Sequence, residues 1–163
     1  MTTSPIVDYR EEQPYAAIRA CVAGDDIPAL LPPLVPEVIA WLSMNHITPA
    51  GPPFFRYLSM DADRRFLVDV GMPVQQAIAA DGRIVAGAFP AGSYASVTHT
   101  GDFRHLREAH MLLEDWMDKA GLNDKTESPA GSITWKGRTE FYLSDPKLEP
   151  NPEVWRTEIA FLL

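Results

Sequence analysis

The sequence predicts an α+β fold in which two related β-α-β-β units share one largely antiparallel sheet, with two main helices on one face. Three observations predict it. Landmark residues recur in the same order in both halves, each half holds one long helical stretch among strand-like runs, and two helices are too few to cover both faces of a parallel sheet.

The internal repeat is the most informative feature. Each half contains a tyrosine that opens a strand, a helical tryptophan, a Tyr-Leu-Ser tripeptide and a closing strand. These are Tyr15, Trp41, 57–59 and 66–74 in the first half, and Tyr94, Trp116, 142–144 and 154–163 in the second. A single repeated tripeptide can arise by chance, but four landmarks in the same order are much harder to explain by chance. We therefore predict a single domain over residues 1–163, with repeat halves of about 5–80 and 82–163.

The first half reads as strand, helix and two strands. Residues 15–22 alternate weakly and are rich in strand formers. Residues 28–45 form a helix with prolines at its start, where a missing N–H is tolerated. The strands 54–60 and 65–74 join at a polar turn.

The second half repeats this order after a linking hairpin, in which strands 82–89 and 92–99 meet at the Pro-Ala-Gly turn. The helix 103–120 follows. Asp102 caps it, Gly121 ends it, and an apolar stripe runs along it. The stripe consists of Phe103, Leu106, His110, Leu113 and Met117. Strands 133–143 and 153–163 close the fold, and we expect Trp41 and Trp116 to be structural.

Composition excludes several classes of partner. Fourteen basic and 22 acidic residues give a net charge of −8, which repels nucleic acid and anionic membranes. The single Cys21 excludes an intrachain disulfide and suits a reducing cytoplasm. The first 15 residues have no apolar signal core. We expect a cytoplasmic protein without membrane contact.

The sequence indicates no metal, cofactor or nucleophile. His105 and His110 are five residues apart on a helix and point to different faces, and neither His46 nor His99 belongs to a ligand motif. Nucleophile-elbow and phosphate-loop patterns are absent. Asp69 and Glu158 occupy equivalent repeat positions, and we interpret both as structural, although Glu158 has the alternative of facing Glu140.

Specific motifs in the second half make the chain resemble the GyrI-like family. They are P-A-G-x-Y-A at 90–95, G-R-T-E-F-Y-L-S-D-P at 137–146 and R-T-E-I at 156–159. The resemblance implies a pseudo-twofold axis and a ligand cleft between the halves. It also implies lipophilic cations as ligands, bound against a buried glutamate framed by aromatics. That family includes effector-binding domains of multidrug-sensing regulators and stand-alone proteins, some of which hydrolyse cyclopropane-bearing alkylating agents, and its founding type protects DNA gyrase.

The strand around Glu140 is the candidate ligand site. Period two places Glu140 and Tyr142 on one face, with the repeat-related Phe55 and Tyr57. If Phe141 faces the layer beneath the helices, this group lies on the opposite face. One carboxylate among three rings suits a delocalised cation, and Glu140 matches the family's ligand-facing glutamate.

Three functions follow from this site. The first is binding or sequestration of lipophilic, preferably cationic compounds. The second is hydrolysis of cyclopropane-bearing alkylating agents with Glu140 as the acid–base group, and the third is a gyrase-inhibitor-like module with a protein partner. We expect binding without turnover, because no second titratable group is placed on this face by the sequence. The pattern does not predict an oligomeric state.

Overall fold

The computed structural model describes all residues, 1–163, and confirms the α+β class. Its elements are β1 (Ile6–Arg10), β2 (Gln13–Ala23), η1 (Gly24–Asp26), α1 (Ile27–Leu30), α2 (Leu34–Met44), β3 (Phe54–Met60), β4 (Arg65–Pro73), β5 (Ile84–Phe89), β6 (Gly92–Thr100), η2 (Phe103–His105), α3 (Leu106–Ala120), β7 (Lys125–Glu127), β8 (Ile133–Tyr142), η3 (Pro152–Val154) and β9 (Arg156–Leu162).

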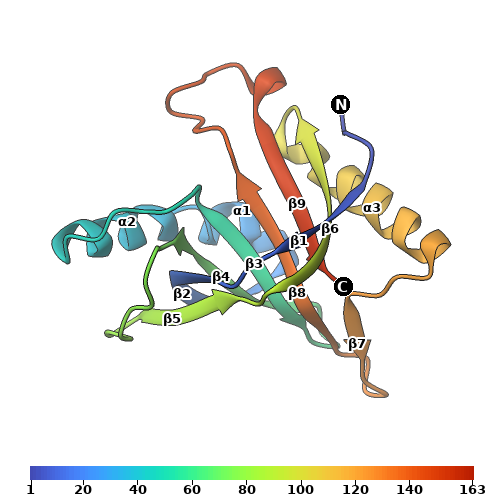
Figure 1. The fold of residues 1–163 in the computed structure, drawn as a ribbon, viewed down its shortest axis with the longest axis horizontal. Coiled ribbons are helices and arrows are strands. Elements are labelled where there is room, and N and C mark those ends of the chain that lie inside the picture. The colour runs from blue at the N-terminus through green and yellow to red at the C-terminus, as the bar shows by residue number, and fades with distance from the viewer.

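A single curled sheet carries the pseudo-twofold relation. Its order is β1-β6-β9-β8-β3-β4-β2-β5, with the short β7 added to β8, and all named pairs are antiparallel. From the central pair outwards the order is equivalent in both directions: β3, β4, β2, β5 on one side and β8, β9, β6, β1 on the other. In Figure 1 the central strands run between α2 on the left and α3 on the right.

Strand registers match the halves residue by residue. Asp69 pairs with Arg56 in β3, and Glu158 pairs with Phe141 in β8, so these acids are equivalent. The same equivalence aligns Tyr57 with Tyr142, as the Tyr-Leu-Ser repeat predicts. Phe55 and Glu140 are themselves equivalent and lie directly opposite one another, which places the pseudo-twofold axis between them.

The prediction of a linking hairpin between residues 82–89 and 92–99 is wrong, because these two strands do not pair with each other. β5 pairs with β2 of the first half, whereas β6 pairs with β9 and with β1, a strand that the sequence did not reveal. The first strand of each half, β1 or β5, therefore pairs with a strand of the other half. The reason is geometric. β1 and β5 are the two end strands of the sheet, and each pairs with the neighbour that the sheet offers there. The Pro-Ala-Gly turn joins β5 to β6 but does not require them to pair.

The helices begin and end at prolines, a capping aspartate and a glycine. Pro32 and Pro33 divide the predicted helix 28–45 into α1 and α2, because proline cannot donate within a helix interior. The second helix is as predicted: the Asp102 carboxylate accepts from the Arg104 N–H at 3.0 Å, and Gly121 ends it with φ 70°. No single helix is long and apolar enough to span a membrane, and only the bent pair 24–30 and 34–44 meets that test jointly.

Both helices pack on the same face. α2 buries Leu34, Val38 and Leu42 against β2 and β4, and α3 buries a stripe against β6 and β9. That stripe is Leu106, Ala109, Leu113 and Met117, with His110 at its edge. The face above β3 and β8 is thus bordered by a helix on each side.

Candidate functional site

The central strands bring the four predicted ligand residues together. Phe55 and Tyr57 lie on one face of β3, and Glu140 and Tyr142 lie on the same face of β8. Phe55 and Tyr142 meet edge to face, with their ring centres 4.9 Å apart. The grouping predicted from strand periodicity is therefore present in the structure.

The face on which this group lies differs from the expectation. Phe55, Tyr57 and Tyr142 pack with the α2 side chains, so the group lies beneath the helices. Phe54 and Phe141 instead join Tyr15 and Phe89 in an apolar cluster on the opposite face. Both faces of these strands are apolar, so periodicity separated the residues correctly but did not show which set the helices cover.

Glu140 is a buried carboxylate with several polar neighbours. Only 5% of the residue is exposed. The Tyr142 hydroxyl donates to its Oε2 at 3.3 Å, and His110 Nε2 lies 3.6 Å from its Oε1. Burial opposes ionisation, but His110, Tyr57 and Tyr142 together hold the pKa of Glu140 below its ordinary value. Glu140 is therefore charged at neutral pH.

The two tyrosines keep their protons and act as hydrogen-bond donors. Burial, reinforced by the Glu140 charge, raises the pKa of Tyr57 and of Tyr142 well above the ordinary phenol value. Both phenols therefore stay uncharged and protonated around neutral pH. The site combines one negative charge with apolar rings and hydroxyl donors.

A family model described as the GyrI-like small molecule binding domain matches residues 4–163. The chain belongs to the GyrI-like family. A comparison with curated proteins found no match.

Solved structures similar to this GyrI-like protein support the fold. The EcmrR C-terminal domain matches with TM-score 0.71 and 20% identity, covering 98% of this chain and 96% of that one. In the EcmrR–DNA complex, the chain covers 56% of the EcmrR chain, with TM-score 0.70, 20% identity and 98% of this chain covered.

Two further relatives have similar folds. SAV2435 bound to tetraphenylphosphonium matches with TM-score 0.62 and 8% identity, covering 98% of this chain and 93% of that one. A hydrolase from Listeria innocua matches with TM-score 0.58 and 16% identity, covering 97% and 90%. At these identities the similarity concerns the fold.

An aromatic row extends the site of this GyrI-like protein beyond the predicted residues. Phe103 lies edge to face with Tyr142 at 5.5 Å, and Trp155 lies 4.6 Å from Phe103. The row leads from Glu140 towards the segment 143–155. The sequence places Phe103 on a helix stripe, and neither Phe103 nor Trp155 shares a local pattern with Glu140.

A buried arginine lies beside the site and is already neutralised. Arg138, two residues before Glu140, pairs with Glu114 at 2.7 Å and with Asp124 at 3.2 Å. Its guanidinium lies over the rings of Phe161 and Trp135, at 4.1 and 4.8 Å from the ring centres. Two acids therefore accompany one arginine, and the Glu140 charge has no permanent cation of its own.

His110 is a neighbour of Glu140 that the sequence did not indicate. The sequence places it on a helix stripe and in no metal-ligand motif. Its contact with Glu140 joins α3 to β8, and no local pattern encodes such a contact. No group of three or more His, Cys, Asp or Glu side chains is arranged to hold a metal ion.

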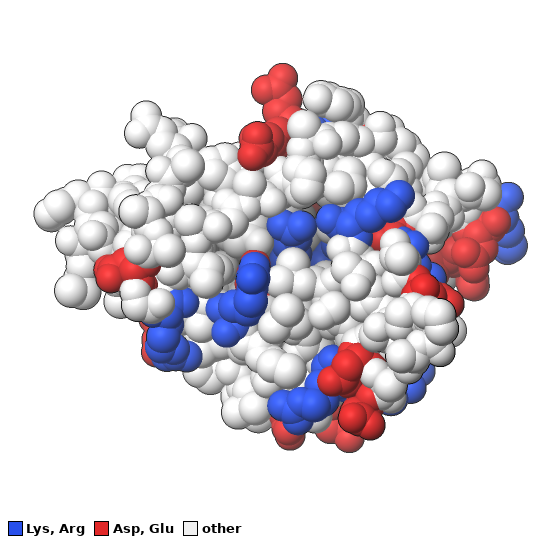
Figure 2. Space-filling model, turned by 90° about the horizontal axis from the view of Figure 1, so that it is seen from below, with Lys and Arg blue, Asp and Glu red and all other residues white.

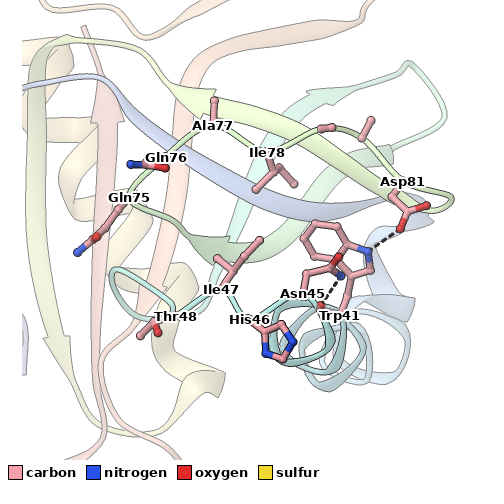
Figure 3. A pocket seen from close by; sticks show the side chains of 12 residues that line it. Trp41, Asn45, His46, Ile47, Thr48, Gln75, Gln76, Ala77, Ile78 and Asp81 are labelled. Carbon is pink, nitrogen blue, oxygen red and sulfur yellow. Dashed lines mark hydrogen bonds between the residues drawn. The ribbon is translucent and has the colours of Figure 1, made fainter.

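A separate cavity lies at the far end of the first half. It measures about 690 Å³ and lies between the C-terminal end of α2 and the segment 75–81 (Figure 3). Trp41, which we expected to be purely structural, borders it and donates from Nε1 to Asp81 at 2.9 Å. None of its lining residues belongs to the Glu140 group, and none is a buried charge. The chemistry therefore favours the Glu140 group as the candidate site.

Glu158 and Asp69 lie on the face away from Glu140. Asp69 is fully buried and binds Arg19 at 2.7 Å, while Glu158 binds Arg10 of β1 at 2.8 Å. The alternative that Glu158 faces Glu140 is wrong, because it alternates with Ile159, whose side chain packs against α3.

Proposed function

We propose that this GyrI-like protein binds lipophilic, preferably cationic small molecules at Glu140, on the face bordered by α2 and α3. The observation that carries the proposal is a buried, ionised carboxylate among Phe55, Tyr57 and Tyr142 without a permanent counter-ion. A desolvated charge of this kind attracts a cation strongly, and the ring faces add cation–π attraction.

Unpartnered polar atoms on the same face support a ligand site there. The Oγ1 of Thr157 is buried without a hydrogen-bond partner, and Thr157 lies opposite Tyr142 in the β8–β9 pairing. The Nε1 of Trp135, in the cluster that contains Tyr57, is likewise unpartnered. Such atoms are uncommon in native interiors, and a ligand with polar substituents would satisfy them.

A charge-matched pair of ligands tests the proposal. SAV2435, a relative of similar fold, was solved with tetraphenylphosphonium, which makes this cation the natural probe. We expect it to bind here with micromolar affinity, about −8 kcal/mol. Tetraphenylborate, an anion of the same shape, should bind at least about tenfold more weakly. Titrations followed by calorimetry or tryptophan fluorescence measure both, and equal affinities would remove the role assigned to Glu140.

Hydrolysis is the second candidate function, and one specific observation favours it. His110 lies 3.6 Å from Glu140, so the site holds the second titratable group that the sequence did not place there. A carboxylate–imidazole pair can activate water for attack on a strained ring. A Listeria innocua hydrolase has a similar fold, so the fold is compatible with this reaction class.

We nevertheless expect binding without turnover of cyclopropane-bearing alkylating agents. A general base works best with a pKa near the working pH, whereas the pKa of Glu140 is lowered from its ordinary value despite the opposing effect of burial. Such a carboxylate suits a counter-ion better than a base. Mass spectrometry after incubation with these compounds measures product. Turnover that disappears in both Glu140→Gln and His110→Gln would establish the hydrolase instead.

The charge of the chain and its family indicate which macromolecules it can contact. The net charge of −8 opposes direct contact with nucleic acid. On the face in Figure 2, Lys and Arg form a band with Asp and Glu beside it. We therefore propose that any regulatory role, or a role like that of a gyrase inhibitor, operates through a protein partner. The unpaired, exposed Cys21 is compatible with a cytoplasmic location, which we also propose.

A further inference from the structure

We infer that His110 is a proton-operated counter-ion of Glu140, so that a proton on His110 and a cationic ligand compete for the same carboxylate. This inference rests on the proposed function, because it concerns how cation binding at Glu140 is regulated. It makes the site a binder whose affinity for cations rises with pH.

The position of His110 supports this role. It lies on the inner edge of α3, with 18% of its side chain exposed, and its Nε2 is 3.6 Å from Glu140 Oε1. Its ring lies 5.6 Å from that of Phe161. No other histidine approaches Glu140: His105 pairs with Glu108 on the exposed side, and His99 bonds Thr2 and the Asp102 carbonyl.

The other charged groups around His110 are already paired. On β8, Arg138 is paired with Glu114 and Asp124. Glu114, one turn further along α3, is thereby neutralised as a competitor for His110. The charged groups of α3 on the preceding turn, Arg107 and Glu108, are both exposed.

The tyrosines complete the surroundings. Tyr57 on β3 and Tyr142 on β8 both face Glu140 and remain uncharged, because burial raises the pKa of each phenol. Among these neighbours, His110 is therefore the one imidazole, the type of side chain that serves as a proton switch in proteins, and it lies against Glu140.

The direction of the pH effect follows from charge. An imidazolium at His110 neutralises Glu140 and repels an incoming cation. A neutral imidazole leaves the carboxylate charge available to the ligand. Proton and ligand therefore exclude one another, and by linkage the ligand must expel the proton when it binds.

The test is a titration of the intact protein with tetraphenylphosphonium from pH 5.5 to 8.5. We expect the Kd to fall as pH rises, by up to about tenfold per pH unit wherever the ligand must displace a bound proton. Calorimetry at acidic pH in two buffers of different ionisation enthalpy should show release of up to one proton per ligand. His110→Gln should flatten the profile, while the matched control His105→Gln, on the exposed side of the same helix, should retain it.

The outcomes separate the inference from the proposed function. If the wild type binds no cation at any pH, the proposed function fails. If it binds with a flat profile and no proton release, or if His110→Gln keeps the wild-type slope, the inference fails and the function stands. The proton count on the wild type decides the matter even if His110→Gln does not fold.

Discussion

Replacing Glu140 with glutamine is expected to weaken tetraphenylphosphonium binding by about 2–5 kcal/mol, roughly 30-fold or more in Kd. The amide keeps the shape of the side chain and can still accept from the Tyr142 hydroxyl, but it lacks the charge that this buried site offers a cation. Binding of tetraphenylborate should not suffer, because the substitution removes a repulsive charge. Calorimetry with both ions at pH 8 measures the difference.

The matched control for this substitution is Glu158→Gln. Glu158 lies on β9, the strand next to β8, but it pairs with Arg10 on the opposite face. Its loss should leave the affinity for tetraphenylphosphonium unchanged. An unchanged affinity in Glu140→Gln with an intact fold would make Glu140 a structural residue.

Replacing Asp69 with alanine is expected to lower the free energy of unfolding by about 2–3 kcal/mol, because Arg19 is half exposed and the buried Tyr15 hydroxyl loses its acceptor. Asp69 is 0% exposed, binds Arg19 through both carboxylate oxygens at 2.7 and 2.9 Å, and accepts from the Tyr15 hydroxyl. Its removal leaves a buried phenol and a guanidinium without their shared acceptor. Urea unfolding followed by circular dichroism measures the loss as a lower midpoint at an unchanged slope.

The repeat provides the control for that loss. Glu158 occupies the equivalent position, but its side chain is 27% exposed and its partner is the single Arg10. Glu158→Ala should therefore cost about 1 kcal/mol or less. Equal losses at the two positions would contradict the view that burial and the tyrosine contact make Asp69 critical.

The repeat allowed much of the fold to be predicted from the sequence. Tyr57 and Tyr142 are equivalent in the strand registers, as the tripeptide indicated, and the caps of the second helix are Asp102 and Gly121. The exchange of β1 and β5 between the halves was not predictable. Pairing at the ends of a sheet depends on distant partners, and the turn between two strands does not require them to pair with each other.

The grouping of residues around Glu140 was predicted in part. Strand periodicity alone grouped Phe55, Tyr57, Glu140 and Tyr142, because alternate residues of a strand share a face. Phe103 and Trp155, which extend the aromatic row, come from a helix start and a strand start far apart in the chain. The contacts of Phe103 with Tyr142 and with Trp155 depend on how these elements pack.

By itself, the sequence determined the fold class, the two related halves and which residues of the central strands lie together, because each depends on local periodicity or on repetition. Only the tertiary structure decided which face the helices cover and which group stands beside Glu140. Both faces of β3 and β8 are apolar, so either would bury well against a helix. His110 reaches Glu140 across 30 residues of chain, through the packing of α3 on the sheet, and no local sequence pattern encodes that contact.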